Sequence, residues 1–316
     1  MRNLCLMVSR MEYSDIKEGR TGAVVVLYNP DFALLRKGLG MLADSVDILC
    51  LVDNSQTDNS TELSGIQNVT YIPLLENRGI AAAQNVGLRS LRKLGVEYVL
   101  FSDQDSVAAP DTVSRLKRAH SLLRAKGAKV GGVGTRAMNV ETGKPYPSKA
   151  KEYETIEVGN GDSIMQVTRC SYIRASISLM RLSSFVEISG YDESLFIDGV
   201  DNEWCWRAAT KGYKFYIAED AKIVHHLGEG DHHIAGRNLS ISSTFRIYYQ
   251  FRNYIWLCRR SYVPGWWKRK HLLKYAVKMI YYPLCVSPRM VFAKGILRGI
   301  ADGLSHGKKP EFGKIE

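Results

Sequence analysis

Short apolar runs alternate with longer amphipathic segments along the first half of the chain. Runs of strand length stand at residues 22–28, 47–52, 69–74, 98–102 and 130–133. Between them, at 32–42, at 80–94 and after Pro110, apolar residues recur at helical spacing. Strands that alternate with helices predict βαβ units and a parallel sheet covered on both faces. The first half is therefore expected to be α/β.

Polar residues follow four of these strands at the point where each one ends. They are Asn29 and Asp31, Asp53 and Asn54, Asn77 and Arg78, and Asp103 and Asp105. Ligands of open parallel sheets bind beyond the carboxyl ends of the strands. Strand ends that converge on one edge therefore indicate a binding site.

Asp103 and Asp105 are the sharpest chemical signal at this edge. Side chains two residues apart on a strand point the same way. Two carboxylates at this spacing suit one hard divalent cation, or one cation and one sugar hydroxyl. An isolated Asp-x-Asp more often only ends a strand, so the motif gains its meaning from the other strand ends.

The second half of the chain is less regular. Residues 139–169 are polar and predict a loop or an excursion hairpin near the mouth of the site. Residues 200–211 predict a helix opened by acids, which suits the positive end of a helix. Short strands at 214–218 and 222–224 lead to His225. The histidines at 225, 226, 232 and 233 leave a zinc site as a minor alternative, without cysteines at matching spacing.

Positive charge is concentrated near the C-terminus. The net charge is +11, and residues 259–310 hold twelve Lys and Arg against one acid, so the remainder is neutral. Within this part, Lys270, His271, Lys274 and Lys278 share one helical face, and apolar residues around Leu272 share the other. A basic amphipathic helix with nearby tryptophans is typical of a membrane-surface helix. The alternatives are a helix packed on its own domain or on a partner subunit. No nucleic-acid module is visible, so nucleic acid is not expected.

The compartment is predicted from cysteines and hydropathy. None of the six cysteines forms a Cys-x-x-Cys pair, and several lie in apolar runs, which favours reduced thiols in the cytoplasm. Residues 1–20 contain acids and lack the features of a signal peptide. No window has the roughly 20 apolar residues that a spanning helix needs.

An ordered set of motifs resembles the inverting nucleotide-sugar glycosyltransferases of family 2, which have the GT-A fold. The matching segments are Tyr28-Asn29-Pro30, Asp53-Asn54-Ser55, Glu76-Asn77-Arg78-Gly79 with Asn85, Asp103-Gln104-Asp105, Gly190-Tyr191-Asp192-Glu193, Asp201-Asn202-Glu203 before Arg207, and His225-x-x-Gly228. The segments at 101–106 and 196–204 look closest to the bacterial rhamnosyltransferase branch. The resemblance implies an α/β fold with a mixed, Rossmann-like sheet flanked by helices, followed by a C-terminal helical extension.

The resemblance also implies roles for individual residues. Asp201 matches the catalytic base; the usual acidic pair is Val200-Asp201 here, so Asp198 is a rival base or a supporting partner. Asp105 would hold Mg²⁺ or Mn²⁺ against the diphosphate, with Asp103 and His225 as further metal contacts. The residues implied on the donor side are Tyr28, Asn29, Asp53, Asn54, Arg78, Asn85, Asp103 and Gln104. Those implied on the acceptor side are Asp192, Glu193, Asn202, Glu203 and Trp204.

The function that follows from the resemblance is transfer of a sugar, L-rhamnose from dTDP-L-rhamnose, to a lipid-linked glycan during O-antigen or related polysaccharide synthesis. The enzyme would lie on the inner face of the membrane, bound peripherally through its C-terminal part, and could form a homo-oligomer. The rival hypotheses are a family 2 enzyme with another UDP- or dTDP-hexose donor, and a catalytically silent glycan-binding scaffold. A dinucleotide oxidoreductase is disfavoured because no Gly-x-Gly-x-x-Gly follows the first strand.

The expected domain organisation has three parts. Residues 1–20 form an N-terminal extension, and residues 21–240 form the catalytic domain. Within that domain, the nucleotide-sugar half covers about 21–135 and the acceptor half about 136–240. Residues 241–316 form the basic, aromatic-rich helical region.

Overall fold

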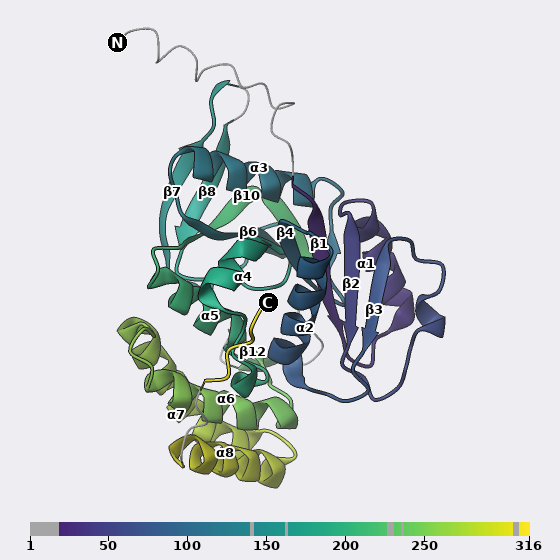
Figure 1. Cartoon of the computed structure of the whole chain (residues 1–316). Helices are drawn as coiled ribbons and strands as arrows, with labels where there is room; N and C mark the ends of the chain where they lie inside the picture. The colour runs from purple at the N-terminus through teal and green to yellow at the C-terminus, as the bar shows by residue number, and fades with distance from the viewer. Residues whose placement is uncertain (1–18, 140–141, 162–163, 226–230, 235–236, 306–309) are drawn as a thin grey trace.

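The computed structural model describes residues 19–139, 142–161, 164–225, 231–234, 237–305 and 310–316, and only the backbone between 224 and 240. One mixed sheet organises the catalytic part, in the order β3-β2-β1-β4-β9-β6-β10-β8-β7, with β5 paired to β10. Figure 1 shows this sheet with helices on both faces and a layer of C-terminal helices at one end.

The first half folds as the apolar pattern predicts. Its elements are β1 (Thr21–Leu27), α1 (Phe32–Ala43), β2 (Ile48–Asp53), β3 (Val69–Pro73), α2 (Gly79–Lys93), β4 (Tyr98–Asp103), β5 (Val107–Ala108), α3 (Thr112–Ala125) and β6 (Val130–Asn139). Strands β3, β2, β1 and β4 run parallel. Every residue of β2 is buried, which agrees with a central strand covered on both faces.

The register of these strands brings the predicted strand ends together. Leu27 at the end of β1 lies opposite Asp53 on one side, while Val26 lies opposite Asp103 on the other. The convergence of polar residues on one edge of the sheet is therefore confirmed.

The second half completes the sheet with β7, β8 and β9 in antiparallel pairs and with β10 parallel to β6. Its elements are β7 (Glu152–Val158), β8 (Met165–Cys170), β9 (Ser178–Arg181), α4 (Leu182–Ile188), the short turn η4 (Glu193–Leu195), α5 (Val200–Ala209) and β10 (Lys214–His225), followed by the pair β11 (Asp231–Ile234) and β12 (Arg237–Ser240). The polar stretch contains a true hairpin, β7–β8, that joins the sheet through β10. The two short strands predicted at 214–218 and 222–224 are one strand with a register shift after Ala218.

Two apolar cores lie on the two faces of the sheet. One contains α2, α4 and α5 residues such as Leu88, Phe185 and Trp204, and the other contains α1 and α3 residues such as Leu39 and Leu116. This sandwich fixes the strand ends and the N-terminus of α5 relative to one another.

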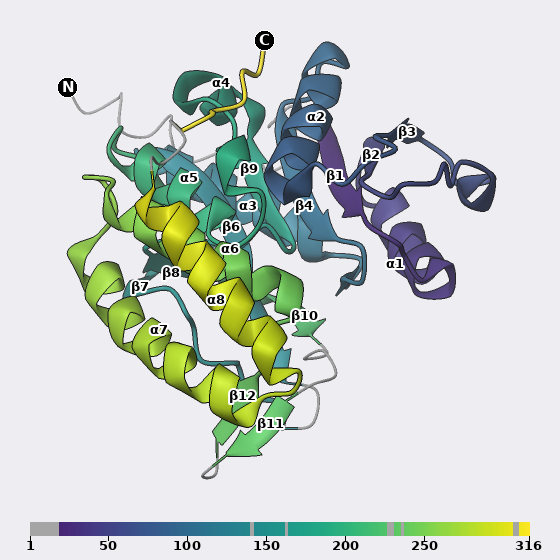
Figure 2. The ribbon, with the colours of Figure 1, turned by 90° about the horizontal axis from the view of Figure 1, so that it is seen from below.

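Three helices follow, α6 (Thr244–Cys258), α7 (Gly265–Cys285) and α8 (Arg289–Leu304), and they share a small core of their own. Seen from below, α7 and α8 run side by side (Figure 2). Helices α6 and α8 can approach closely because glycines at four-residue spacing face α6. A Cβ atom at Gly299 would lie 2.5 Å from the Tyr248 carbonyl oxygen. No helix among the described residues is long and apolar enough to cross a membrane.

Candidate active site

The two predicted metal-binding carboxylates lie at the open end of β4. Asp103 and Asp105 are both exposed at this strand end. Between them, Gln104 is tied to β1: its side chain accepts from the Tyr28 N–H at 2.8 Å and donates to the Tyr28 carbonyl at 3.3 Å. Gln104 thus holds the end of β4 against the end of β1, and leaves the Tyr28 side chain half-exposed.

Residues after β2 form the wall beside this edge. The fully buried Asp53 carboxylate accepts from the Ser55 N–H at 2.9 Å, the Asn59 amide at 2.8 Å and the Tyr71 hydroxyl at 2.9 Å. These contacts order the loop after β2. In this structure the Asp53 carboxylate therefore serves the loop rather than an open surface.

Asn54 and Asn29 continue the same wall. The side-chain Oδ1 of Asn54 accepts from the Arg78 backbone N–H at 3.0 Å, and the Asn29 backbone N–H donates to the Ser55 hydroxyl at 2.9 Å. Arg78 keeps about half of its side chain exposed, 3.6 Å from Glu76, so its guanidinium is accessible to a ligand. The predicted donor-side residues other than Asn85 thus lie at one edge of the sheet, and several of them act by shaping it.

The residues present fit a divalent cation in type. Asp103 and Asp105 offer exposed carboxylate oxygens, the ligands that Mg²⁺ and Mn²⁺ prefer. Val107, two residues after Asp105, pairs with Val224, so the backbone of His225 lies beside this segment. The His225 side chain lies outside the described residues. Among the side chains that are described, no group of three His, Cys, Asp or Glu residues gathers.

Asp201 occupies the second position of α5 and faces the same edge. Its side chain is only partly exposed and lies deep among protein atoms, and burial raises the pKa of Asp201 to about 6, with the negative charge of Asp103 adding to the rise. A hydrogen bond from the Ala175 backbone and the charge of Arg174 oppose this shift. A carboxyl group that titrates near neutral pH suits a general base.

Asp198, the rival base, is held by a cation. The guanidinium of Arg246 from α6 contacts both of its carboxylate oxygens, with Nε 3.1 Å from Oδ2. Only about a fifth of its side chain is exposed. Of the two carboxylates, Asp201 is therefore the one without a cation in direct contact among the described residues.

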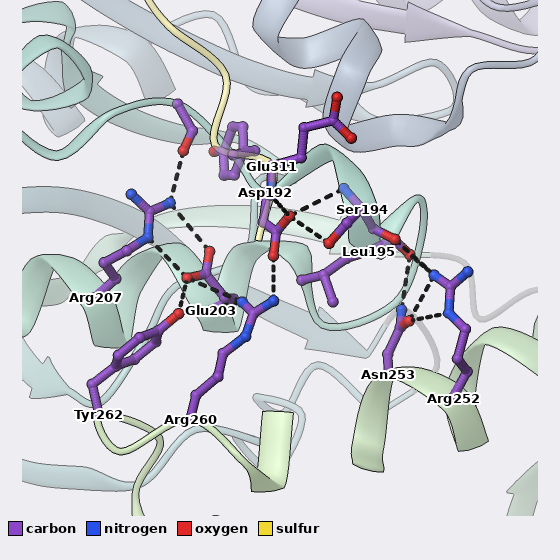
Figure 3. A network of polar contacts seen from close by, with 12 residues as sticks. Asp192, Ser194, Leu195, Glu203, Arg207, Arg252, Asn253, Arg260, Tyr262 and Glu311 are labelled. Carbon is purple, nitrogen blue, oxygen red and sulfur yellow. Dashed lines mark hydrogen bonds and ion pairs between the residues drawn. The ribbon is translucent and has the colours of Figure 1, made fainter. Parts of the chain in front are cut away.

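Three residues expected on the acceptor side are buried in a structural network instead. Asp192, Glu203 and Trp204 have no exposed surface. Asp192 accepts from Ser194 and the Glu311 N–H and pairs with Arg260, while Glu203 pairs with Arg207 and accepts from the Tyr262 hydroxyl at 2.6 Å (Figure 3). Breaking such a buried ion pair costs about 3–5 kcal/mol.

The position of Trp204 completes this correction. Its ring stacks on Phe185 at 4.3 Å, and its indole N–H donates to the Ser189 carbonyl at 2.9 Å. It is a core residue and no wall of an acceptor groove. Asn202 and Glu193 remain partly exposed, and their acceptor-side role stays a prediction.

Asn85 also has a positioning role rather than the donor contact that the resemblance implies. Fully buried on α2, it accepts from the Tyr191 N–H at 2.8 Å and donates to the Tyr191 carbonyl and to Glu193, both at 2.9 Å. It holds the Gly190–Glu193 turn against α2.

The sequence reasoning missed contributions from the C-terminal helices. Asn253 of α6 donates to the carbonyls of Leu195, Ile197 and Asp198 at 2.9, 2.7 and 2.9 Å. This single amide thus fixes the loop that leads into α5. The available signal was a lone amide among the aromatic and apolar residues of 251–257, which favours a buried, satisfied polar group.

Comparisons with known proteins show the family of this chain. The model of glycosyl transferase family 2 matches residues 23–179. The chain is 33% identical over 248 residues to dTDP-rhamnosyl transferase RfbF from Shigella flexneri, covering 77% of this chain and 81% of that protein.

Solved structures show the fold. A 1–349 fragment of S. aureus TarS with UDP-GlcNAc aligns with a TM-score of 0.54 at 15% identity, over 90% of this chain and 80% of that one. A longer TarS chain is covered to 43%. GalNAc-T7 with UDP, GalNAc and Mn²⁺ aligns with a TM-score of 0.53 at 13% identity, over 86% of this chain and 58% of that one. The mixed sheet with flanking helices is thus a GT-A-like fold, and the chain belongs to glycosyl transferase family 2 as a glycosyltransferase of the rhamnosyltransferase-like branch.

Proposed function

We propose that this enzyme transfers L-rhamnose from dTDP-L-rhamnose to a lipid-linked glycan, with inversion at the anomeric carbon. The observation that carries the donor is the 33% identity to a curated protein named dTDP-rhamnosyl transferase, which extends over most of both chains. Synthesis of O-antigen or a related surface polysaccharide is the setting that such a donor and acceptor suggest.

Asp201 acts as the general base in this proposal. Its carboxylate removes the proton from the acceptor hydroxyl while that oxygen attacks the anomeric carbon and the bond to the diphosphate breaks. One base suffices for inversion, because no covalent sugar–enzyme intermediate forms. Burial supports this role, since it raises the pKa of Asp201 to about 6, close to the pH at which the base must both accept and release a proton.

The donor occupies the edge formed by β1, β2 and β4. Asp103 and Asp105, with His225, would hold Mg²⁺ or Mn²⁺, which supplies positive charge for the departing diphosphate. The accessible guanidinium of Arg78 and the half-exposed Tyr28 lie at the same edge and contact the nucleotide.

The membrane is the proposed location of the acceptor. On α7, Leu272, Leu273 and Ile280 are 61%, 70% and 61% exposed. Helix α8 adds Met290 and Leu297, exposed to a similar extent. A contiguous exposed apolar surface marks an interaction site. We place this surface against the headgroup boundary of the inner leaflet, where Arg269 and Lys270 on the same helix meet anionic lipid.

A screen of nucleotide sugars tests the function. Purified protein with Mg²⁺ or Mn²⁺ is incubated with dTDP-L-rhamnose, dTDP-glucose, UDP-glucose and UDP-GlcNAc, with and without a lipid-linked monosaccharide acceptor. Release of dTDP from dTDP-L-rhamnose, faster with acceptor, is expected. Asp105→Asn should abolish release and weaken dTDP binding, while Asp111→Asn, the same change on the surface of the domain, should not.

Each other outcome has a defined meaning. Preference for a UDP-sugar would assign another donor within the family. Failure to cleave any donor while dTDP still binds would favour a silent glycan-binding scaffold. Equal dTDP affinity with and without metal would remove the metal from the proposal.

A further inference from the structure

Helix α7 does not pack on the rest of the protein through its apolar face. Part of its basic side points inward: Lys278 donates to Gln250 at 2.7 Å and to the Ser242 hydroxyl at 3.2 Å, and His271 stacks on the buried Trp267 at 4.3 Å. Lys270 and Lys274 keep exposed surface. Its apolar side, around Leu272, is exposed. Because placing a cation against protein carries a desolvation cost, the inward position of Lys278 requires an explanation.

Four cations from different parts of the chain gather in front of this face. They are Lys149 before β7, Arg174 before β9, and Lys274 and Lys278 of α7, which we name the cationic cluster. Each lies within electrostatic reach of at least one other member. Water reaches Lys149, Arg174 and Lys274, all of which keep exposed surface.

The cluster is not neutralised by the acids near it. Asp198 is the carboxylate that attracts Lys149, Lys274 and Lys278 among the described residues, and Arg246 already contacts both of its oxygens. Arg246 adds a further positive charge, which repels Lys149 and Lys278 and lowers their pKa. Burial, reinforced by neighbouring cations, lowers the pKa of these three lysines to about 8. An anion between them would relieve both causes.

The cluster adjoins the base. The positive charge of Arg174 lowers the pKa of Asp201, and the backbone of the next residue, Ala175, donates a hydrogen bond to the Asp201 carboxylate. The donor edge, at the ends of β1 and β4, supplies Asp103 and Asp105, whereas the cluster is built from α7 and the segments before β7 and β9. The base therefore lies between an acidic donor edge and a cationic surface.

We propose that the cationic cluster binds a phosphate or diphosphate group carried by the acceptor, and so presents the acceptor hydroxyl to Asp201. This inference rests on the proposed function for the identity of the acceptor. Ammonium and guanidinium groups bind phosphate oxygens through charge-assisted hydrogen bonds. The apolar side of α7, on the same helix as Lys274 and Lys278, would receive the lipid chain that such a phosphate carries.

A binding experiment tests the cluster without turnover. Inorganic phosphate is titrated calorimetrically into protein already saturated with dTDP and Mg²⁺, so that the donor phosphate positions are filled. Wild-type protein should bind phosphate, and the double variant Lys149→Gln/Lys274→Gln should bind it at least about tenfold more weakly, as expected when charge-assisted contacts are removed. Lys294→Gln on α8 removes the same charge elsewhere and should bind like wild type.

A kinetic experiment then identifies the source of the phosphate. Two acceptors are compared in neutral detergent micelles, one sugar linked through a diphosphate to a prenyl chain and the same sugar linked directly to an uncharged alkyl chain. The double variant should raise KM about tenfold or more for the first acceptor only, with the KM for dTDP-L-rhamnose unchanged.

Four results would overturn the inference. The first two are no phosphate binding by wild type and equal phosphate binding by the double variant. The third is a loss of dTDP affinity in the double variant, and the fourth is a loss of its binding to phosphatidylglycerol vesicles that matches its loss of phosphate binding. The third would assign the cluster to the donor diphosphate, and the fourth to bilayer headgroups. Absence of rhamnosyl transfer by wild type would instead contradict the proposed function, and it leaves the phosphate titration readable.

Discussion

Asp198 and Asp201 lie three residues apart, yet the fold gives the two carboxylates different chemical environments. Asp198 receives the guanidinium of Arg246 across both oxygens. Burial and repulsion by Asp103 raise the pKa of Asp201, while a backbone hydrogen bond and the charge of Arg174 lower it. The same residue type thus forms an ion pair with an arginine at one position and has a pKa raised to about 6 at the other.

The rate of transfer should report this difference. Because burial raises the pKa of Asp201 to about 6, the carboxyl is protonated and inactive below that pH, and it becomes a base as the pH rises through 6. We expect kcat/KM to fall about tenfold per pH unit below 6 and to reach a plateau above 7. Asp201→Asn should lower the plateau by about 10²–10⁴-fold and remove this pH dependence.

Asp198→Asn serves as the matched control for that profile. In Asp198→Asn the fall of kcat/KM below pH 6, the acid limb of the profile, should persist even if the plateau rate changes. If the limb survives in Asp201→Asn and disappears in Asp198→Asn, the base has been assigned to the wrong carboxylate.

At the scale of elements, helix α6 acts as a clamp on the loop that precedes α5. Phe196 and Asp198 of this loop both have a positive φ of 64°, and such sparsely populated conformations cost a non-glycine residue about 1–3 kcal/mol. Asn253 holds three carbonyls of the loop, and the Phe196 ring stacks on Tyr249 at 4.8 Å. From the other side, the Ile80 N–H at the start of α2 donates to the Phe196 carbonyl at 2.8 Å. The loop is therefore strained and held by two helices.

Loss of the Asn253 clamp should impair catalysis more than donor binding. Asn253→Asp removes both N–H donors and directs a carboxylate at three carbonyl oxygens, at a cost of about 1–3 kcal/mol for the unsatisfied groups. We expect kcat to fall about 10–10²-fold with the Kd for dTDP nearly unchanged. Asn68→Asp, the same change at an exposed turn, is the control. A parallel fall in dTDP affinity would mean that the whole domain, and not the loop, has been disturbed.

At the scale of the whole molecule, the C-terminal region is part of the catalytic unit. The final residues return to the turn before α5 beside α2 and α4 (Figure 1), where the Gly313 N–H donates to the Tyr191 carbonyl at 3.0 Å and the Gly190 N–H donates to Gly313 at 2.7 Å. The Arg207 guanidinium lies 4.0 Å from the Phe312 ring centroid. Because these contacts hold the turn before α5 and Arg207 in its last turn, removal of the C-terminal region should disturb the position of Asp201, the proposed base.

Membrane attachment is therefore tested by point substitution. Leu272→Ser/Ile280→Ser should weaken co-sedimentation with vesicles by about tenfold or more, since inserting each side chain contributes about 1.5–3 kcal/mol. Leu34→Ser, on the exposed side of α1, is the matched control. High salt should weaken wild-type binding without abolishing it, because screening acts on charges and leaves the apolar contribution intact. Full binding by the double variant would show that this face meets another partner.

Trp267 corrects one expectation about that attachment. Tryptophans near a basic helix predict an interfacial anchor, but Trp267 is 3% exposed and packs on Trp206 at 5.0 Å. Helix periodicity identified two faces of α7 correctly and could not say which one faces the protein. That choice depends on what α6 and the loop around Asp198 present to it.

Local chemistry alone determined a large part of this protein. Apolar runs of strand length predicted β1 to β4 and β6 but not the two-residue strand β5, since such runs are buried wherever the strands pair. Asp103 and Asp105 followed from where a strand ends. Similarity in the order of motifs was enough for the family. These features depend on neighbours in sequence, which the chain itself carries.

The tertiary structure decided which polar residues are free to act. Asp192, Glu203 and Asn85 have the same residue types as site residues, yet all three are buried. Asp192 and Glu203 are buried because Arg260, Tyr262 and the residues after 310 reach them from more than 50 positions away in the sequence. Asn85 is buried because α2 packs against the turn before α5. The partner of a carboxylate sets its charge and its access to water, and long-range packing supplies that partner. The sequence by itself therefore located the proposed catalytic edge, whereas only the fold separated Asp201, the proposed base, from the residues that hold it in place.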